Sequence, residues 1–359
     1  MKHKHGGDIY SMPDILDFSA NINPLGMPKN VQEAAKLGIE KAIYYPEVGS
    51  KQLRDEISKY YNLDSEHVIC GNGAAEIIFY ICLAEQPKKA LLLAPSFAEY
   101  EIALKNVGCD VNYCYLKEAD NFMLTQEYMS YITDDLDIIF LCNPNNPTGQ
   151  MITKEFLIQI VQRCREKQIK VVLDECFIDF SDKLLKQSMR DELKNYENLV
   201  IINAFTKLYA MPGLRLGYAL STNKVLLNKM HQLLQPWNVS VPAQFAGIAA
   251  LKEKEYVIQS REVLKNEKEF LVSELSYLQK QYEQGKSDII KKVFGYEANY
   301  IFFRGSNELA QILQSKGIQI RDCSNYRGLE KGYYRIAIRS HEENQRLISA
   351  MNYNNNCMD

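Results

Sequence analysis

The chain has 359 residues, a length that suits one large domain with a second, smaller one. Apolar residues make up 46% of the chain, which is ordinary for a folded protein, so general disorder is not expected. The net charge is −3 and no basic stripe stands out, which argues against nucleic acid as the main partner.

The same sequence gives no sign of a membrane protein, a secreted protein or a metalloprotein. The longest apolar runs, such as residues 138–141, are far too short to span a bilayer. The N-terminal segment, MKHKHGGDIY, has no apolar stretch typical of a secretory signal. Nine scattered cysteines without a C-x-x-C pair are typical of reduced thiols, and five histidines show no metal-ligand spacing. We therefore expect a cytoplasmic location and no metal.

The middle of the chain alternates short apolar runs with helical patterns. The runs that we expect to be strands are, in chain order, residues 90–94, 138–142, 171–173 and 199–202, with a further strand-like stretch that ends at residue 220. Residues 156–167 have helical spacing of their apolar side chains. Short buried strands separated by helices predict a mostly parallel sheet that is covered on both faces.

From about residue 241 the pattern changes. One long helix, rich in Lys and Glu, is expected over residues 242–282, followed by strands at 300–303 and 334–338. This order predicts a smaller α+β domain. The Asn-rich tail, residues 352–359, is expected to fray.

Polar or turn-forming residues follow four of the expected strands. They are Phe97 with its preceding Pro-Ser, the segment 143–149, Asp174, and Lys207 with its preceding Thr206. In open α/β sheets, ligands bind beyond the carboxyl ends of the strands. Four such ends together are hard to explain by packing, so they predict a binding site.

Lys207 and Asp174 suggest the chemistry of that site. Lysine is normally a solvated surface residue, yet Lys207 lies between two strand-like stretches. An amine at a strand end can form a Schiff base with an aldehyde cofactor. A carboxylate at a neighbouring strand end can keep a pyridinium nitrogen protonated, which makes the ring an electron sink. Taken alone, Asp174 is equally consistent with a helix cap or a surface ion pair.

Other residues could complete such a site. The segment GNGAAE, residues 71–76, opens a helical pattern with small residues, so it could present backbone N–H groups and a helix dipole to a phosphate. A glycine turn without a ligand is the alternative for this motif. Arg215 could reach the same phosphate with its planar guanidinium. Phe97 could stack on an aromatic cofactor, although a core phenylalanine is commoner.

Three motifs, CNPNNPTG, DECFIDF and FTKLYAMPGLRLGY, resemble those of the aspartate-aminotransferase fold family. These are the fold-type I enzymes that use pyridoxal 5′-phosphate (PLP), and the order and spacing match over nearly the whole chain. The resemblance implies a large domain with a mostly parallel seven-stranded sheet flanked by helices, plus a smaller α+β domain. It implies an N-terminal arm with part of the small domain at 1–44, a PLP-binding domain at 45–240 and a C-terminal domain at 241–359.

The resemblance also implies roles for single residues. Lys207 would form the Schiff base, Asp174 would pair with the pyridine nitrogen, and Asn146 would hydrogen-bond the ring hydroxyl. The remaining cofactor contacts would come from Phe97 on the ring and from Gly73, Ala74, Thr206 and Arg215 on the phosphate. Tyr45 resembles a tyrosine that reaches the phosphate of the partner subunit, which implies a homodimer.

Two positions depart from the family pattern. Ala204 stands three residues before the lysine, where the family usually has Ser or Thr, so one phosphate hydrogen bond is missing or is supplied elsewhere. Phe177 stands three residues after the aspartate, where many of these aminotransferases have a tyrosine that donates to the ring hydroxyl. A phenylalanine cannot donate this bond.

Two branches of the family are most similar, the histidinol-phosphate aminotransferases and the L-threonine-O-3-phosphate decarboxylases. The stretches HGGDIY, DFSANINPLG, APSFAEYE and IRDCSNYRGLEKGYYRIAIR look more like the decarboxylases. The resemblance then implies PLP-dependent decarboxylation of L-threonine O-3-phosphate to (R)-1-amino-2-propanol O-2-phosphate in cobalamin biosynthesis. Histidinol-phosphate aminotransferase is the alternative. A PLP-binding regulator on this fold would need an extra N-terminal DNA-binding module, and here the motifs begin near residue 5.

A substrate with both a carboxylate and a phosphate needs several guanidinium groups. By resemblance, Arg335 would hold the carboxylate and Arg321 the phosphate. Arg339 follows Arg335 with the two-residue period of a strand, and is either a further contact or a surface arginine. His5 resembles an N-terminal histidine that folds over the site, the alternative being an unordered terminus. Asn23 and Asn146 are the remaining expected substrate contacts.

The substrate clamp would decide the reaction. In this family the bond that breaks at Cα is the one held perpendicular to the cofactor ring, because only its electrons can enter the conjugated system. The same lysine, ring and aspartate serve decarboxylation and transamination, so the residues that orient the carboxylate select between them.

Overall fold

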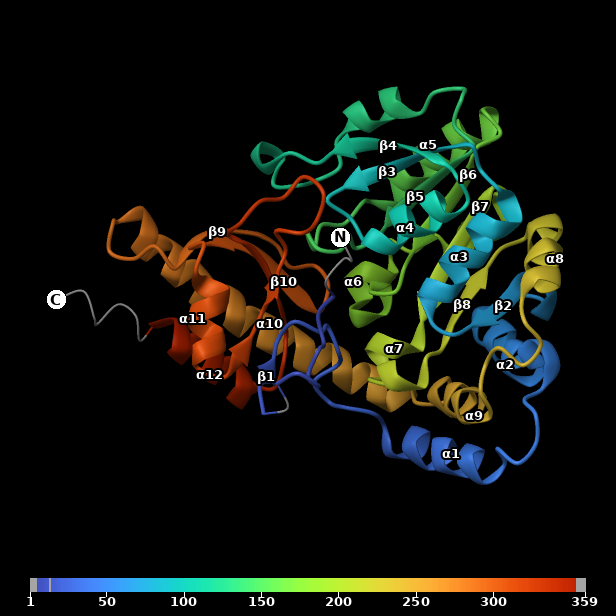
Figure 1. The fold of residues 1–359 in the computed structure, drawn as a ribbon, viewed down its shortest axis with the longest axis horizontal. Helices are drawn as coiled ribbons and strands as arrows, with labels where there is room; N and C mark the ends of the chain where they lie inside the picture. The colour runs from blue at the N-terminus through green and yellow to red at the C-terminus, as the bar shows by residue number, and fades with distance from the viewer. Residues whose placement is uncertain (1–4, 13, 353–359) are drawn as a thin grey trace.

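The computed structural model describes residues 5–12 and 14–352, which form a large lobe and a small lobe (Figure 1). The segments 1–4 and 353–359 lie outside the described residues, and with them almost all of the tail that we expected to fray. The large lobe is built on a seven-stranded sheet with the order β2-β8-β7-β6-β5-β3-β4. Its strands are β2 (Val68–Gly71), β3 (Lys89–Ala94), β4 (Asp110–Tyr115), β5 (Ile138–Cys142), β6 (Lys170–Asp174), β7 (Leu199–Ala204) and β8 (Gly217–Leu220).

Six of these strands run parallel and β8 runs against them. The four central runs predicted from the sequence are confirmed as β3, β5, β6 and β7. They are almost continuously buried because helices cover both faces, so the strands need apolar side chains on both sides. The predicted mostly parallel seven-stranded sheet is therefore confirmed.

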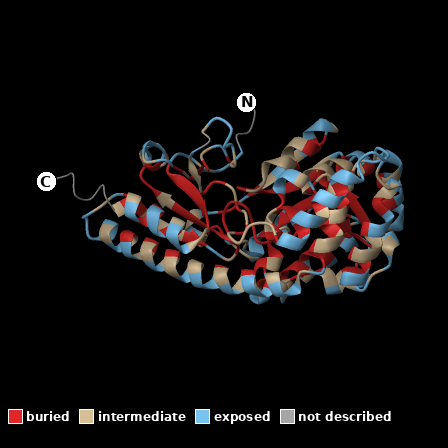
Figure 2. Cartoon of the chain, turned by 90° about the horizontal axis from the view of Figure 1, so that it is seen from below, coloured by how far each residue is buried: buried red, intermediate tan, exposed pale blue. Residues whose placement is uncertain are grey.

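Alternate side chains of the strands pack against different helices. Leu92 and Phe140 belong to a core that includes apolar residues of α3, α4 and α8, whereas Leu91 and Ile139 belong to a core with those of α5. Figure 2 shows the resulting pattern, with buried strands inside and helices exposed on their outer faces. The helices of this lobe are α2 (Lys51–Tyr61), α3 (Ala74–Glu85), α4 (Ala98–Asn106), α5 (Lys154–Glu166), α6 (Asp182–Leu185), α7 (Phe205–Leu208) and α8 (Lys224–Leu233).

The small lobe contains an antiparallel sheet of order β12-β13-β10-β9. Its elements are β9 (Ile290–Gly295), β10 (Tyr300–Gly305), β12 (Arg321–Asp322), β13 (Tyr333–Ala337), α11 (Leu309–Ser315) and α12 (His341–Asn352). The N-terminal arm joins this lobe, because β1 (Leu16–Asp17) pairs in parallel with β11 (Ile318–Gln319). The arm then continues into α1 (Lys29–Glu40), which lies beside the large lobe (Figure 1).

The single helix expected over residues 242–282 is wrong, because the structure has two helices there. They are α9 (Val241–Ala250) and α10 (Lys254–Glu283), separated by a turn at 251–253. The break allows α9 to pack on α1 while α10 runs across to the small lobe (Figure 1). The α1–α9 approach is very close, since a Cβ on Gly38 would lie 2.6 Å from Cα of Pro242.

Within residues 5–12 and 14–352, no helix combines the length and the apolar composition needed to cross a bilayer. In the same part of the chain, His, Cys, Asp and Glu side chains form no group of three or more that could ligate a metal ion.

Candidate active site

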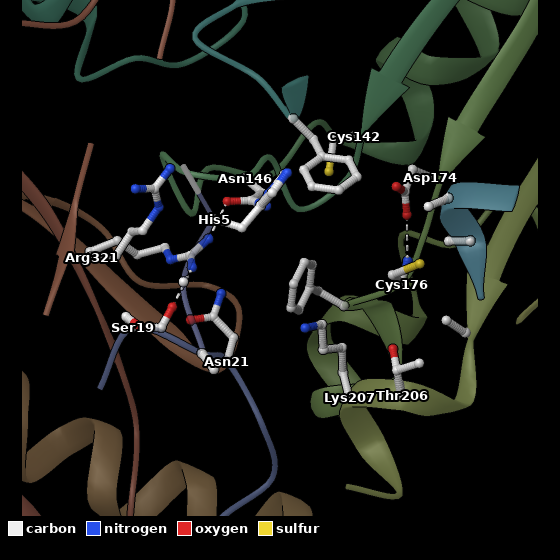
Figure 3. Close-up of a pocket in the computed structure, with 18 of the residues that line it drawn as sticks. His5, Ser19, Asn21, Cys142, Asn146, Asp174, Cys176, Thr206, Lys207 and Arg321 are labelled. Carbon is white, nitrogen blue, oxygen red and sulfur yellow. Dashed lines mark hydrogen bonds between the residues drawn. The ribbon is translucent and has the colours of Figure 1, made fainter. Parts of the chain in front are cut away.

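A cavity of about 330 Å³ lies where the carboxyl ends of β5, β6 and β7 face the small lobe and the N-terminal arm. Register brings the ends of the large sheet together, since Cys142 on β5 pairs with Asp174 on β6. The strand-end residues singled out in the sequence therefore meet at one edge of the sheet, as parallel strands require. Figure 3 shows the two sides of this cavity, with Asn146 and Arg321 opposite Lys207.

Lys207 lies in the one-turn helix α7, directly after β7, and its amine points into the cavity (Figure 3). Burial and the nearby positive charge of Arg335 lower the pKa of this amine to about 8, against 10.5 for an ordinary lysine. A lowered pKa leaves more of the amine neutral near physiological pH, and the neutral form is the nucleophile.

Asp174 is held by two donors on the floor of the cavity. Its Oδ1 accepts the backbone N–H of Cys176 at 3.0 Å, and its Oδ2 accepts the phenol O–H of Tyr100 at 2.7 Å. Tyr100 is fully buried, and burial together with the charge of Asp174 raises the pKa of its hydroxyl well above the usual value. Tyr100 therefore keeps its proton and donates it in the hydrogen bond to Asp174, whose side chain lines the cavity.

Asn146 and Arg335 meet on the opposite wall. The Nη1 atom of Arg335 donates to Oδ1 of Asn146, and Nη2 donates to the backbone carbonyl of Ser19 at 2.8 Å. Arg335 is 6% exposed, and its Nε has no hydrogen-bond partner among the described residues. The contacts of its guanidinium in that part of the chain are neutral, namely the Asn146 side chain, the Ser19 carbonyl and the ring of Tyr300 at 5.3 Å. A buried charge without a counter-ion is costly, so this guanidinium marks a place for an anionic ligand.

Arg321 lies beside Arg335, because β12 and β13 pair in register at these two residues. It is 5% exposed, and its guanidinium donates to the carbonyl of Asp322 at 2.7 Å and to Oδ1 of Asn325 at 2.8 Å. The same guanidinium lies 5.1 Å from the ring centroid of Tyr326. Two buried arginines on one wall give this side of the cavity a strong positive potential.

The other end of the cavity is built from small residues and main chain. Ala74 begins α3, and Thr206, Ala204 and Arg215 line the cavity with it. Gly73 has φ +83 and ψ 171, a backbone conformation that essentially only glycine adopts, and a Cβ there would also lie 2.6 Å from Nη2 of Arg215. Gly73 itself is not among the lining residues, but it allows Arg215 to reach the start of α3.

His5 and Phe97 close a further side of the cavity. His5 lies 3.0 Å from the carboxylate of Glu99 in α4, and its ring centroid is 6.4 Å from that of Phe97. The segment behind it is fixed on the arm, because the N–H of Gly7 donates to Oγ of Ser19 at 2.8 Å. His5 thus bridges the small-lobe side and the large lobe across the cavity.

Besides Gly73, three residues expected at the site are not among those that line the cavity, and Asn23 is one of them. Its Nδ2 donates to the carbonyl of Leu208 at 2.7 Å and to Oγ of Ser260 at 2.6 Å. It therefore ties the arm to α7 and α10. Asn21, two residues earlier, lines the cavity instead, and its buried Oδ1 has no partner among the described residues.

Arg339 and Tyr45 also lie away from the lining. Arg339 donates to the carbonyl of Asp17 at 3.1 Å and to Oε1 of Glu343 at 2.7 Å. Strand β13 ends at Ala337, so the two-residue period used to place Arg339 beside Arg335 no longer applies there. Tyr45 is 77% exposed and stacks on Trp237 with a centroid distance of 4.4 Å.

Tyr100, Tyr326 and Asn21 were missed by sequence reasoning. Tyr100 lies three residues after Phe97 in the quoted APSFAEYE stretch, so its place one helical turn along was a usable signal. Tyr326 and Asn21 lie in irregular segments, where periodicity gives no information about direction.

Comparison with known proteins identifies a family and several similar proteins. The sequence profile of the family "Aminotransferase class I and II" matches residues 13–351. The chain is 35% identical to a threonine-phosphate decarboxylase of Salmonella typhimurium, over 97% of this chain and 95% of that protein. It is 32% identical to the "Adenosylcobalamin biosynthesis bifunctional protein CobDQ" of Leptospira interrogans, over 97% of this chain and 40% of that protein.

Among solved structures, the histidinol-phosphate aminotransferase from Clostridium acetobutylicum superposes with a TM-score of 0.87 at 35% identity. The alignment covers 95% of this chain and 99% of that one. Relatives at the same level of identity thus carry two different enzyme names.

Proposed function

Because the chain belongs to the aminotransferase class I and II family, we propose that it is a PLP-dependent decarboxylase of L-threonine O-3-phosphate. The products are (R)-1-amino-2-propanol O-2-phosphate and CO₂, and the proposed place of the reaction is cobalamin biosynthesis. The observation that carries the choice of decarboxylation is the 35% identity to a threonine-phosphate decarboxylase over 97% of this chain. The two buried arginines on the wall that faces Lys207, Arg321 and Arg335, support the binding of such a substrate. Two guanidinium groups suit a small substrate that has one carboxylate and one phosphate.

The residues of the cavity fit pyridoxal phosphate. A lysine amine, a buried carboxylate and an aromatic ring are present as Lys207, Asp174 and Phe97, and the start of α3 at Ala74 with Arg215 suits a phosphate. Bound there, the cofactor supplies an aldehyde carbon and a protonatable ring that withdraws electrons from the Cα of the substrate. Asp174 would hold the ring nitrogen, and Asn146 would hold the ring hydroxyl.

The arginines then orient the substrate. Arg335 would exchange its contact with Asn146 for the substrate carboxylate, and Arg321 would bind the phosphate. Charge-assisted hydrogen bonds of this kind contribute about 1.5–3 kcal/mol each. Anchoring both anions fixes the direction of the Cα–carboxylate bond, which is the property that selects decarboxylation.

Lys207 and the N-terminal arm complete the reaction. As the Cα–carboxylate bond breaks, CO₂ leaves and a proton takes its place on Cα. Lys207 is the lining amine with a pKa near 8, so it suits the role of proton donor to Cα. His5, held by Glu99, would cover the cavity and exclude water.

Histidinol-phosphate aminotransferase is the second candidate, favoured by the 35% identity and the TM-score of 0.87 to the clostridial structure. In that reaction Arg321 would also bind a phosphate, and Arg335 would bind the carboxylate of the amino-group acceptor. The two candidates thus use the same arginines but release different products.

The first test is a direct comparison of substrates. We expect the purified protein to release CO₂ from L-threonine O-3-phosphate much faster than it forms glutamate from histidinol phosphate and 2-oxoglutarate. Evolved CO₂ and glutamate would be measured separately at matched substrate concentrations. Faster glutamate formation would show that the protein is the aminotransferase.

The substitution Arg321→Ala tests whether Arg321 binds the phosphate of the substrate. We expect KM for threonine phosphate to rise by about tenfold to a hundredfold, as the loss of one charge-assisted contact implies. Slow turnover of unphosphorylated threonine should not change. Arg304→Ala is the matched variant, because Arg304 contacts Glu118 and Glu330 away from the cavity. Equal effects of both substitutions would contradict the assignment of Arg321 to the phosphate.

A further inference from the structure

The side-chain amide of Asn146 is fixed by donors on one of its two ends. Its Oδ1 receives hydrogen bonds from Nη1 of Arg335 and, at 3.3 Å, from the hydroxyl of Tyr326. Because an amide oxygen accepts and an amide nitrogen donates, two donors on Oδ1 orient the NH₂ group away from them. Among the residues that the structure describes, Nδ2 of Asn146 donates to no protein acceptor, although Asn146 lines the cavity.

If the proposed function holds, Arg335 donates to Asn146 only until a substrate binds. Arg335 would turn to the substrate carboxylate, which competes with Asn146 for the same guanidinium. The hydroxyl of Tyr326 is then the donor that remains on Oδ1. Phe177 cannot donate to the ring hydroxyl of the cofactor, so the NH₂ group of Asn146 carries this contact, and its orientation matters more than it would beside a tyrosine.

Tyr326 is well placed to hold the amide. It is 5% exposed, and the turn around it is closed by its N–H to the carbonyl of Cys323 at 3.0 Å and by its carbonyl to the N–H of Leu329 at 3.1 Å. The guanidinium of Arg321 lies 5.1 Å from its ring centroid. Burial raises the pKa of the Tyr326 hydroxyl, so the hydroxyl keeps its proton over the working pH range.

We propose that Tyr326 is a positioning residue that holds the amide of Asn146 with its NH₂ group toward the cofactor ring. It does so both before and after Arg335 engages a substrate. The proposal rests on PLP binding in the proposed function, but not on whether the reaction is decarboxylation or transamination. Tyr326 lines the cavity, and its proposed role is exerted through the hydrogen bond of its hydroxyl to Oδ1 of Asn146.

The experiment is a pH titration of the visible absorption of the holoenzyme in saturating succinate, a carboxylate without an amino group that can engage Arg335 but cannot react with the cofactor. The midpoint reports proton loss from the lysine-bound cofactor, and a hydrogen bond to the phenolic oxygen of the ring lowers this midpoint. Tyr326→Phe removes the hydroxyl that donates to Asn146, so the NH₂ group is held less firmly toward the ring, and we expect the midpoint to rise by about 0.5 to 1 pH unit, the equivalent of one ordinary hydrogen bond. Tyr334→Phe is the matched control. Tyr334 is buried like Tyr326, but it lies on β13 and its hydroxyl donates to the carbonyls of Ser306 and Asn307. This variant should leave the midpoint unchanged.

A double-mutant cycle separates positioning from a general disturbance. Asn146→Ala should raise the midpoint at least as far as Tyr326→Phe, and the double variant should match Asn146→Ala alone. A wild-type midpoint in Tyr326→Phe, or shifts that simply add in the double variant, would overturn the proposal. Absence of a visible cofactor band in the wild-type protein would instead contradict both the proposed function and this inference. A normal band in the wild-type protein with an unshifted midpoint in Tyr326→Phe would contradict only the inference.

Discussion

Lys207 combines burial with a position in the cavity, and this combination decides its reactivity. Its folded-state pKa is about 8, lowered first by burial and then by Arg335. A base with a lowered pKa loses its proton at lower pH, so the neutral fraction rises up to pH 8 and levels off above it. At pH 7 about a tenth of the amine is neutral, far more than for an ordinary lysine.

We therefore expect the rate at which pyridoxal phosphate attaches to the apoprotein to rise about tenfold from pH 6 to 7 and to level off above pH 8. Attachment can be followed by visible absorption and by mass spectrometry after borohydride reduction. Lys207→Ala should show no reducible link. Lys268→Ala is the control, because burial also lowers the pKa of Lys268 to about 8, yet its amine donates to the carbonyl of Glu297 outside the cavity. A rate that keeps rising tenfold per pH unit to pH 10 would contradict the lowered pKa.

At the scale of elements, an ion-pair network supports the segment after β6. Arg190 makes two parallel hydrogen bonds to Asp179, at 2.7 and 2.8 Å, and its Nε lies 3.3 Å from Oε2 of Glu175. Asn203 of β7 joins the network through Oδ2 of Asp179. The network therefore links the ends of β6 and β7, from which Asp174 and Lys207 extend.

Arg190→Met is expected to destabilise the fold by about 3–5 kcal/mol, because it leaves buried carboxylates without their cation. Urea unfolding of the apoprotein would measure this loss. Arg163→Met is the control, since Arg163 forms an exposed pair with Glu166, and it should cost less than about 1 kcal/mol. Equal losses would mean that burial of the network adds nothing.

The same network has a defined acid dependence. Burial alone would raise the pKa of Asp179, but the charge of Arg190 outweighs burial and holds it below the usual value. A carboxyl group with a lowered folded-state pKa stabilises the fold above its unfolded pKa, and this contribution disappears as the pH falls through the folded value. For Glu175 burial dominates and raises the pKa, so the sign is opposite.

At the scale of the whole molecule, an exposed apolar surface surrounds Tyr45. The side chains in this patch, all more than half exposed apart from Trp237, are Ile39, Ile43, Tyr44, Tyr45, Val48 and Trp237. Contiguous exposed apolar side chains of this kind mark interaction surfaces. Because Tyr45 does not reach the cavity of its own chain, we expect it to serve the cavity of a second copy.

We therefore expect a homodimer in solution, measured by sedimentation equilibrium. Tyr45→Ala should weaken cofactor retention by about tenfold, the loss of roughly one hydrogen bond to a phosphate. Tyr277→Ala, at an exposed tyrosine of α10, should change neither property. A monomer with full activity at low concentration would refute the shared site.

How much of the site could be read from the sequence differs from residue to residue. Lys207, Asp174 and Asn146 follow strands directly, and the pairing of neighbouring strands brings such ends together without further information. Arg321 and Arg335 were expected at the site from the family resemblance, and the structure brings them together by pairing β12 with β13 at these two residues. Asn21 and Asn23 could not be separated in this way, because both lie in an irregular segment.

The sequence by itself determined the fold class and the chemical character of the site, because buried strands require continuous apolar runs and the reactive side chains follow those runs directly. The tertiary structure alone decided which loop residues face the cavity. Asn23 is turned away by a contact with Ser260, and Tyr326 reaches Asn146 from the other lobe. It also decided where the long C-terminal helical region breaks, since α9 packs on α1 while α10 continues to the small lobe. These choices depend on contacts between residues far apart in the chain, which no local pattern encodes.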